Sequence, residues 1–314
     1  MNKIKSFFKL VRWPNLLIIA ITMCLVYYFL MAPLFAIGIA GVLPSSPTFL
    51  LLVVSLVFIV AGGYVINDYY DVEMDKVNKP EKLIVGKIFS EKEAKFFYNV
   101  LSMIGLLTGL ASSIIALKSN FYMIFAILLL LVCVLYSYSS TYKKKFLIGN
   151  IIVSLSVTLA VFLPWIFEVL YVSGNALILS VCRDKLVHNI PFVLIYMGFA
   201  FITTLLREIV KDAEDMDGDA LTNCRTIPIA CGLKKTKIII CVIMLALFVL
   251  LGYYHVIIIN LHANVAMALM ILLDIISIMS VVNLIKIKES REFHKLSVSF
   301  KILMVVGMLT MIFI

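Results

Sequence analysis

The sequence predicts an all-α, polytopic membrane protein whose nine transmembrane helices bundle around a central cavity that opens to the cytoplasmic face. Of its 314 residues 63% are hydrophobic and only 14% are charged, and the mean hydropathy is +1.10. A soluble domain of this length cannot hide so much apolar surface. Apolar runs of about 17–25 residues, long enough to cross a bilayer, also recur along the chain. We therefore expect one integral membrane domain over residues 1–314.

The nine spans are expected near residues 15–37, 48–67, 96–117, 120–139, 147–170, 190–210, 236–255, 261–284 and 297–314. If the N-terminus is cytoplasmic, every Lys and Arg falls in a cytoplasmic segment except Lys118, Arg183 and Lys185. This distribution is what the positive-inside rule requires, and it puts the C-terminus outside. The placement of the basic residues in a membrane protein therefore explains the net charge of +9. We expect the lipid bilayer as a partner and no nucleic acid.

An acidic stretch, Asn67–Asp75, follows the second apolar run. If the helix continues through it, Asp68, Asp71 and Asp75 fall within an arc of roughly 60°, whereas Glu73 points elsewhere. Three carboxylates on one face repel one another, so a positive group is expected among them. Because all-oxygen ligands select hard cations, Mg²⁺ holding a phosphorylated substrate is the favoured interpretation.

A second stretch repeats this arrangement after the sixth apolar run. Asp212, Asp215 and Asp219 have the same spacing of three and then four residues, with Asp217 off the face. A single acidic helix end can equally be a solvated cap, but two copies with matched spacing favour paired metal–diphosphate clamps. Most of the chain's Asp and Glu residues lie in these two loop regions, on the cytoplasmic face of the predicted topology.

Basic residues near the two acidic stretches could neutralise a diphosphate leaving group, which metal alone rarely does completely. Arg12 is either ordinary positive-inside flanking or a phosphate contact. The stretch Tyr136–Lys145 is either interface anchoring or a source of one tyrosine and one lysine for the site. The candidates for binding the diphosphate are Arg12, Asn67, Lys79, Lys87, Lys143 and Lys211.

The two acidic stretches resemble the UbiA superfamily of intramembrane prenyltransferases. The resemblance is carried by Asn67-Asp68-x-x-Asp71-x-x-x-Asp75 after the second span and by Lys211-Asp212-x-x-Asp215-x-x-Gly218-Asp219 after the sixth. It implies an enzyme that binds an isoprenyl diphosphate through Mg²⁺ and transfers the prenyl group to an acceptor. It also implies the catalytic residues, Asp68, Asp71, Asp75, Asp212, Asp215 and Asp219, with Asn67 as a further metal ligand.

Three stretches are most similar to family members that attach a second geranylgeranyl chain to a glycerol-phosphate ether lipid. They are Arg12–Asn15, Asn67–Asp75 continuing to Asn78-Lys79-Pro80, and Arg207–Asp219 with Thr226-Ile227-Pro228. The resemblance therefore implies a lipid acceptor, and an aromatic acceptor such as 4-hydroxybenzoate or a quinone precursor is the alternative. One feature departs from the family: its Tyr-x-x-x-Lys phrase is absent here, because Tyr138 and Lys143 are one residue further apart.

A transporter of a phosphorylated or divalent-ion substrate is the alternative from another class. It predicts charges near the bilayer midplane and broken helices. Asp274 is a carboxylate within the eighth apolar run, and we favour a structural hydrogen bond for it over a functional role. The acidic clusters at one membrane face favour the enzyme. The sequence does not identify protein partners.

Overall fold

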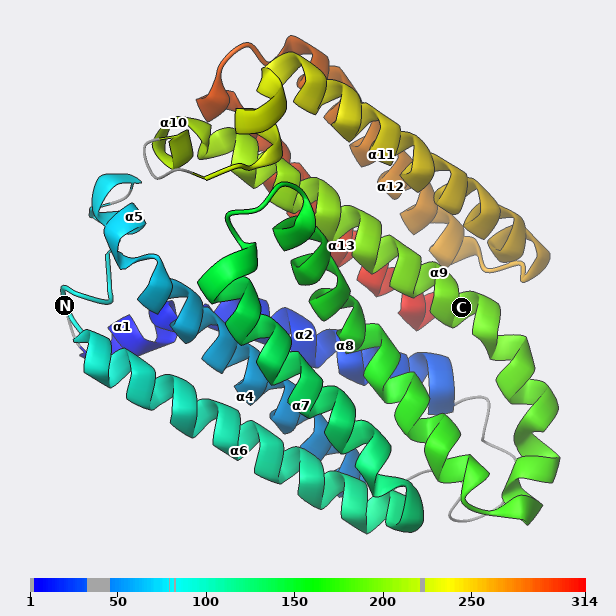
Figure 1. Ribbon diagram of the computed structural model, residues 1–314. Helices are drawn as coiled ribbons and strands as arrows, with labels where there is room; N and C mark the ends of the chain where they lie inside the picture. Colours follow the sequence, from blue (N-terminus) through cyan, green and yellow to red (C-terminus); the bar gives the residue numbers. More distant parts are fainter. Residues whose placement is uncertain (1–2, 33–45, 79, 82, 221–223) are drawn as a thin grey trace. The chain divides into compact units, whose positions relative to one another are not determined.

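The computed structural model describes residues 3–32, 46–78, 80–81, 83–220 and 224–314. Within these ranges the regular secondary structure is helical, and a single β-bridge pairs Val85 with Phe89. Figure 1 shows long helices connected by short loops. Their bounds are α1 Lys3–Leu10, α2 Trp13–Leu25, α4 Ser46–Tyr70, α5 Val72–Asn78, α6 Glu91–Leu117, α7 Phe121–Ser137, α8 Ile148–Ser173, α9 Ala176–Glu214, α10 Met216–Asp219, α11 Ile227–Asn260, α12 Asn264–Lys286 and α13 Phe293–Leu309.

Shorter helical segments complete these elements. Two are π-helices, η1 at Val26–Met31 and η3 at Tyr138–Tyr142. Three are 3₁₀-helices, η2 at Lys118–Asn120, η5 at Ser290–Glu292 and η6 at Thr310–Phe313. In the described part of the chain, nine helices are long and apolar enough to cross a membrane. The predicted all-α fold and its nine spans are therefore confirmed.

The sixth span is longer than its hydropathy predicts. It begins at Ala176 rather than near residue 190, so most of the predicted outer loop is helical. The Asn175 side chain explains the early start, because its Oδ1 accepts hydrogen bonds from the backbone N–H groups of Leu177 and Ile178 and so caps the helix. Charged residues such as Arg183 can lie on a helix that extends beyond the hydrocarbon core. The predicted end of the first span, after residue 32, lies outside the described residues.

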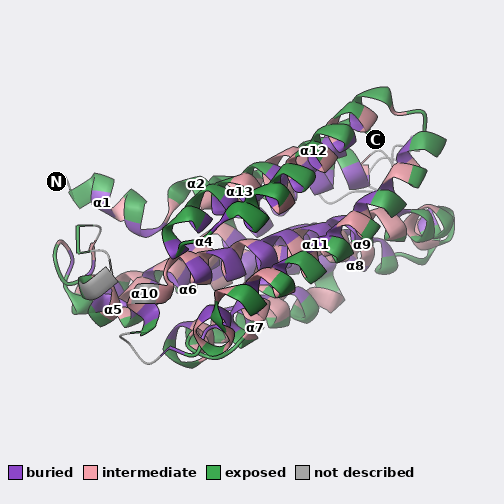
Figure 2. Ribbon diagram, turned by 90° about the horizontal axis from the view of Figure 1, so that it is seen from above, coloured by how far each residue is buried: buried purple, intermediate pink, exposed green. Residues whose placement is uncertain are grey.

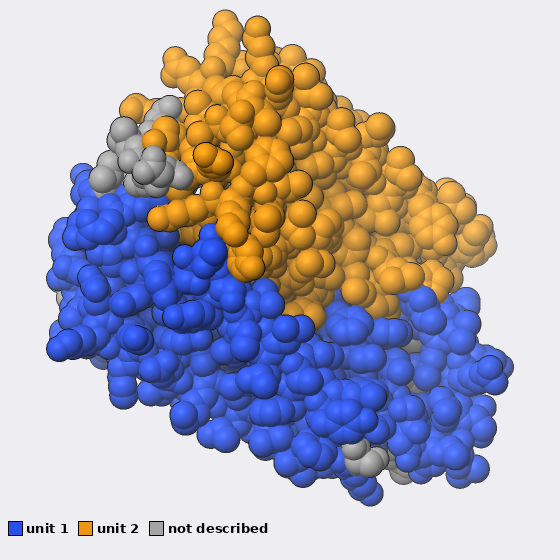
Figure 3. Space-filling view, in the orientation of Figure 1, with its two compact units in different colours: residues 1–141, 160–190 blue, residues 142–159, 191–314 orange. Residues whose placement is uncertain are grey.

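The chain forms two compact units, which are coloured separately in Figure 3. Unit 1 comprises residues 1–141 and 160–190, and unit 2 comprises residues 142–159 and 191–314. Helices α8 and α9 each contribute residues to both units. Unit 1 contains the first acidic stretch and unit 2 the second. The expectation of one domain over the whole chain stays a prediction.

Helices α4 and α6 pack closely in unit 1 through small residues. In α6, Gly105 and Gly109 are four residues apart, and the Ser55 hydroxyl of α4 donates to the Gly105 carbonyl at 2.7 Å. A Cβ atom added to Gly109 would come within 2.3 Å of Leu128 and 2.6 Å of Ser55. Small residues at this spacing let membrane helices approach closely. The burial colouring in Figure 2 marks α7, by contrast, as largely exposed or intermediate.

The end of unit 1 that carries the acidic stretch has its own apolar core. Buried side chains from several elements meet there, including Leu10, Val65, Phe89 and Leu101. The loop before α6 folds back in a tight turn, in which Gly86 adopts a φ of 85°. Ser90 and Glu93 then form the expected capping box at the start of α6. This core gives the acidic helix end a fixed support.

Unit 2 packs parts of α9, α11, α12 and α13 around a buried cluster of hydroxyl groups. The Tyr196 hydroxyl is 2.5 Å from that of Tyr254 and 2.8 Å from that of Thr310. Beside them, the ring of Phe199 packs directly against Gly307, where a Cβ atom would come within 2.2 Å of the ring. Asp274 of α12 lies 3.3 Å from His255 of α11, and its structural role stays a prediction. Helix packing therefore fixes the segment of α9 that leads into the second acidic stretch.

Candidate active site

Both acidic stretches interrupt a helix at their middle aspartate. Helix α4 ends at Tyr70 and α5 starts at Val72, with Asp71 between them, and α9 and α10 are separated in the same way by Asp215. The helical hydrogen bonds nevertheless continue on both sides of each break. Asp71 N–H donates to the Asn67 carbonyl at 3.0 Å, and Asp75 N–H donates to that of Asp71 at 2.8 Å.

The second stretch has the same backbone pattern. Asp215 N–H donates to the Lys211 carbonyl at 2.9 Å, and Asp219 N–H donates to the Asp215 carbonyl at 3.0 Å. Residues 67, 71 and 75 therefore correspond to residues 211, 215 and 219. The equal spacing seen in the sequence is matched by equal local structure, although the two stretches share little other sequence.

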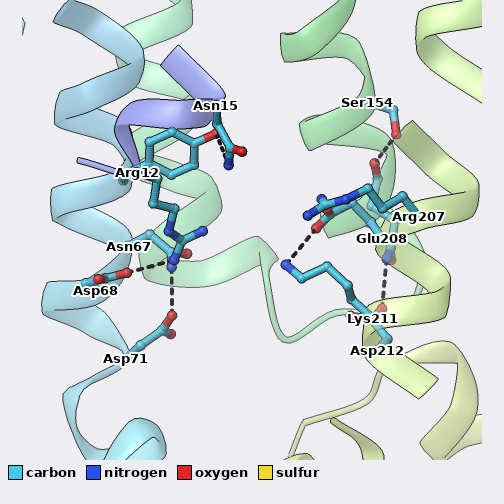
Figure 4. A network of polar contacts seen from close by, with 12 residues as sticks. Arg12, Asn15, Asn67, Asp68, Asp71, Ser154, Arg207, Glu208, Lys211 and Asp212 are labelled. Atoms are coloured by element: carbon cyan, nitrogen blue, oxygen red, sulfur yellow. Dashed lines mark hydrogen bonds and ion pairs between the residues drawn. The ribbon is translucent and has the colours of Figure 1, made fainter. Parts of the chain in front are cut away.

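In unit 1, a guanidinium group lies against the first acidic stretch (Figure 4). The Arg12 Nη2 atom donates to Asp68 Oδ1 at 2.9 Å. The guanidinium also lies over the Tyr64 ring, 4.8 Å from its centroid, and the Asn15 amide donates to the Tyr64 hydroxyl at 3.3 Å. Arg12 thus supplies positive charge beside these carboxylates, as their repulsion required.

The backbone of Arg12 is strained, with φ 52° and ψ 51° in the left-handed region, where it joins α1 to α2. Few residues other than glycine adopt this conformation without cost, so its position here has been fixed by its contacts. Burial alone lowers the pKa of the guanidinium, but the charge and hydrogen bond of Asp68, together with the charges of Tyr64 and Asp71, outweigh this effect and raise the pKa. Arg12 therefore remains a cation at every physiological pH.

Asn67 presents an oxygen that could serve as a metal ligand. Its Nδ2 atom donates to Asp71 Oδ2 at 2.7 Å, which leaves Oδ1 buried and, among the described residues, without a hydrogen-bond partner. Asp71 is itself buried, with 5% exposure. By contrast, the Glu73 side chain is 84% exposed and pairs with Lys76, as expected for a residue off the functional face.

In unit 2, an amide from α8 fixes the first aspartate of the second stretch. The Asn150 Nδ2 atom donates to Asp212 Oδ2 at 2.7 Å, and the Ser154 hydroxyl donates to the Asn150 carbonyl one turn along the same helix (Figure 4). Glu208 and Asp219 both lie within electrostatic range of Asp212. The carboxylates of this stretch are therefore close enough to repel one another, as in a site that binds cations.

Glu208 also belongs to this cluster and was not among the site residues predicted from the sequence. Its carboxylate accepts from Arg207 Nη1 at 2.7 Å and lies 3.9 Å from the Lys211 ammonium. The spacing in the sequence could have identified Glu208, because it precedes Asp212 by four residues and so lies on the same helix face. Lys211, a predicted diphosphate ligand, thus lies beside the acidic residues of its own stretch.

The other lysines predicted to bind the diphosphate lie in different surroundings. Lys87 is exposed in the turn before α6, and no described contact joins it to Asp68, Asp71 or Asp75. Lys79 lies outside the described residues. Lys143 is half-buried in unit 2, where the adjacent Lys144 carbonyl accepts from the backbone of Arg225, which follows the second acidic stretch.

The π-helix η3 covers Tyr138–Tyr142, directly before Lys143. A π-helical hydrogen bond spans one residue more than an α-helical one. The segment η3 therefore coincides with the extra residue between Tyr138 and Lys143, relative to the Tyr-x-x-x-Lys spacing of the family. Tyr136, in the preceding turn, contacts Tyr70. The Tyr70 hydroxyl donates to the Tyr136 hydroxyl at 2.9 Å.

The donor set fits a hard cation, although the carboxylates are not gathered around a centre. In the described part of the chain, no three His, Cys, Asp or Glu side chains are close enough to hold a metal. Oxygen ligands are nevertheless present, because among the described residues the buried Asn67 Oδ1 has no hydrogen-bond partner and the neighbouring aspartates carry carboxylates. The metal-ligand role of these residues stays a prediction.

Comparison with known proteins identifies the family. The model of the UbiA prenyltransferase family matches residues 25–305. The chain belongs to the UbiA prenyltransferase family. It is therefore an enzyme, a prenyltransferase, and an integral membrane protein, as the sequence predicted.

Relatives and solved structures agree with this assignment. A digeranylgeranylglyceryl phosphate synthase from Saccharolobus solfataricus is 33% identical over 247 residues, which cover 79% of this chain and 76% of the relative. A solved structure of a digeranylgeranylglyceryl phosphate synthase has 25% identity and a TM-score of 0.66, covering 99% of this UbiA family chain and 98% of that one. A UbiA homologue from Archaeoglobus fulgidus, bound to DMAPP and Mg²⁺, shares the fold at 16% identity, with a TM-score of 0.56 and coverage of 98% and 99%.

Proposed function

We propose that this prenyltransferase transfers a geranylgeranyl group from geranylgeranyl diphosphate to geranylgeranylglyceryl phosphate, in ether-lipid synthesis and with Mg²⁺ as cofactor. The matched local structure of the two acidic stretches is the observation that carries the proposal. Two helix ends with the same register of oxygen ligands suit one substrate that has two phosphates. The names of the relatives support the lipid acceptor.

In this proposal the two acidic stretches act on the same diphosphate. Asn67, Asp68, Asp71 and Asp75 would hold one Mg²⁺ ion, and Asp212, Asp215 and Asp219 a second. When bound, the ions neutralise the diphosphate and favour its departure. Asn67 directs Asp71 through its amide, and Asn150 directs Asp212 in the same way.

The basic residues would complete the neutralisation of the leaving group. Arg12 uses one guanidinium nitrogen for Asp68, so its remaining N–H donors are available for a phosphate oxygen. Lys211 and Lys143 would contribute further positive charge from unit 2. Such preorganised charge is most effective in a site from which water is excluded.

The reaction exchanges one bond to the prenyl C1 atom for another. The bond from C1 to the diphosphate oxygen breaks, a new C1–O ether bond forms to the acceptor hydroxyl, and that hydroxyl loses its proton. The apolar helices that bind the chain would keep water from the carbon atom while it carries positive charge. The protein would lie with its N-terminus and both acidic stretches at the cytoplasmic face of the membrane.

A single assay tests the proposal. The purified protein is incubated with Mg²⁺, geranylgeranyl diphosphate and either geranylgeranylglyceryl phosphate or 4-hydroxybenzoate, and the products are identified by mass spectrometry. We expect transfer to the lipid acceptor and loss of activity with EDTA that added Mg²⁺ restores. Transfer to the aromatic acceptor alone would overturn the lipid assignment.

A further inference from the structure

A groove runs along the exposed side of α6 and α7 in unit 1, and the residues at its two ends differ in chemistry. It encloses about 530 Å³. Its apolar walls include Met103, Leu106 and Leu110 of α6 and Phe125 of α7. Met103 is 62% exposed, so a hydrocarbon chain could reach the groove directly from the bilayer.

A polar group lies at one end of the groove. Asn99 lines it and is exposed, and among the described residues its amide has no hydrogen-bond partner. A free amide within a membrane-spanning helix is costly, because lipid cannot satisfy it. This polar end therefore favours a ligand whose own polar group hydrogen-bonds to Asn99.

Positive charge continues the same helix face toward the start of α6. Lys92 and Lys95 precede Asn99 by seven and four residues, which places all three on one side of the helix. Both lysines are exposed. Ammonium and amide N–H groups are the kinds of donor that bind a phosphate monoester at a membrane interface.

The length of the groove suits one lipid chain within one leaflet. The twelve residues from Asn99 to Leu110 are separated by eleven helical steps, which span roughly 16 Å, about half of the ~30 Å hydrocarbon core. Aromatic contacts connect its polar end with the first acidic stretch. Tyr98, which lines the groove, has its ring 6.1 Å from that of Tyr136, and Tyr136 meets Tyr70, the residue before Asp71.

We propose that this groove is a docking site for the acceptor, a single-chain glycerol-phosphate lipid, before transfer; the identity of the lipid rests on the proposed function. The phosphate lies at Lys92, Lys95 and Asn99, and the isoprenoid chain lies between α6 and α7. The prenyl diphosphate donor fits this groove less well, because its diphosphate carries more negative charge than two lysines neutralise. In the proposed function the two acidic stretches bind that diphosphate.

Photolabelling tests the groove without requiring turnover. A geranylgeranylglyceryl phosphate analogue with a diazirine in its chain is irradiated with the protein in phosphatidylcholine nanodiscs, and labelled peptides are mapped. We expect label within residues 99–132, reduced about tenfold by Leu106→Trp, which fills the groove, and by Asn99→Leu, which removes the polar contact. Ile104→Trp is the matched control, because Ile104 is exposed on the same helix and does not line the groove.

Competition and kinetics decide between this lipid and bulk phospholipid. Excess unlabelled geranylgeranylglyceryl phosphate should displace the label, and excess phosphatidylglycerol should not. Leu106→Trp should raise the KM for the acceptor about tenfold, with kcat and the KM for the donor unchanged. Equal labelling of the Leu106→Trp and Ile104→Trp variants, or displacement by phosphatidylglycerol, would overturn the docking site.

Failure of the proposed function would appear differently. Wild-type protein that prenylates only the aromatic acceptor refutes that function, whereas labelling of the groove is measured independently of any product. Normal lipid prenylation with unchanged acceptor KM in Leu106→Trp refutes the docking site and leaves the proposed function intact.

Discussion

The Arg12 guanidinium donates to the Asp68 carboxylate at 2.9 Å, across 56 residues of sequence. This ion pair joins the turn before the first membrane helix to the first acidic stretch, at the end of the second. The Asp68 side chain is 18% exposed and the Arg12 side chain 39%, so water only partly screens this ion pair. It makes Arg12 part of the candidate active site as well as a flanking positive charge.

Replacing Arg12 by alanine should lower kcat/KM for the diphosphate donor. Loss of a charge-assisted hydrogen bond is worth about 2 kcal/mol, or roughly thirtyfold in rate. Arg12→Gly should lose the same activity but remain about 1 kcal/mol more stable than Arg12→Ala, because glycine tolerates the left-handed backbone at this position. Steady-state kinetics and thermal unfolding of the two variants separate charge from strain. Wild-type kcat/KM in both would remove Arg12 from the site.

The middle aspartate of each acidic stretch should be essential. Asp71→Ala and Asp215→Ala each remove a carboxylate at the break between two helices, and we expect kcat to fall about a hundredfold or more while membrane insertion stays normal. Glu73→Gln is the matched control for Asp71→Ala, since Glu73 lies two residues away and is exposed. It should retain wild-type activity. Near-normal turnover in either alanine variant would refute the clamp.

Asn150 should control how tightly the second stretch binds metal. Its amide fixes one oxygen of Asp212, and outer contacts of this kind typically change metal affinity about 10–100-fold. Asn150→Leu should therefore need more Mg²⁺ for half-maximal activity, with kcat recovered at saturation. Ser156→Ala serves as control, because Ser156 bonds only to the Ile152 carbonyl of its own helix among the contacts described for it. An unchanged Mg²⁺ titration in Asn150→Leu would show that the amide is merely structural.

The spans and the acidic stretches could be predicted because both are local patterns. Hydropathy marks apolar runs directly, and the spacing of Asp68, Asp71 and Asp75 is visible without knowing the fold. Contacts between distant segments leave no such pattern, so the partners of Asp68 and Asp212 needed the structure. Hydropathy also misplaced the start of α9, because the helix continues through Arg183 and its neighbours where an apolar scan stops.

Glu168 is an acidic residue within the fifth predicted span, and the sequence alone does not show what surrounds its carboxyl group. It lies in α8 and is fully buried, and among the described residues neither carboxyl oxygen has a hydrogen-bond partner. Removing such a group should help folding, since an unsatisfied buried polar group costs about 1–3 kcal/mol. We expect Glu168→Met to unfold at a higher temperature than the wild type in detergent. A lower unfolding temperature would mean that the carboxyl has a stabilising partner, such as water.

Close approach of α4 and α6 should depend on Gly109. A side chain there would meet Leu128 and Ser55, and Ser55 is already fixed by its bond to the Gly105 carbonyl. Gly109→Leu should therefore destabilise the protein by about 1–3 kcal/mol or more, the usual cost of overpacking. Activity should fall too, because α4 carries Asn67 and Asp68 near its end. Gly252→Ala is the control, since nothing lies within 4 Å of a Cβ added at Gly252. Thermal unfolding of both variants in the same detergent measures the difference, and equal unfolding temperatures would refute the role of glycine in this helix pair.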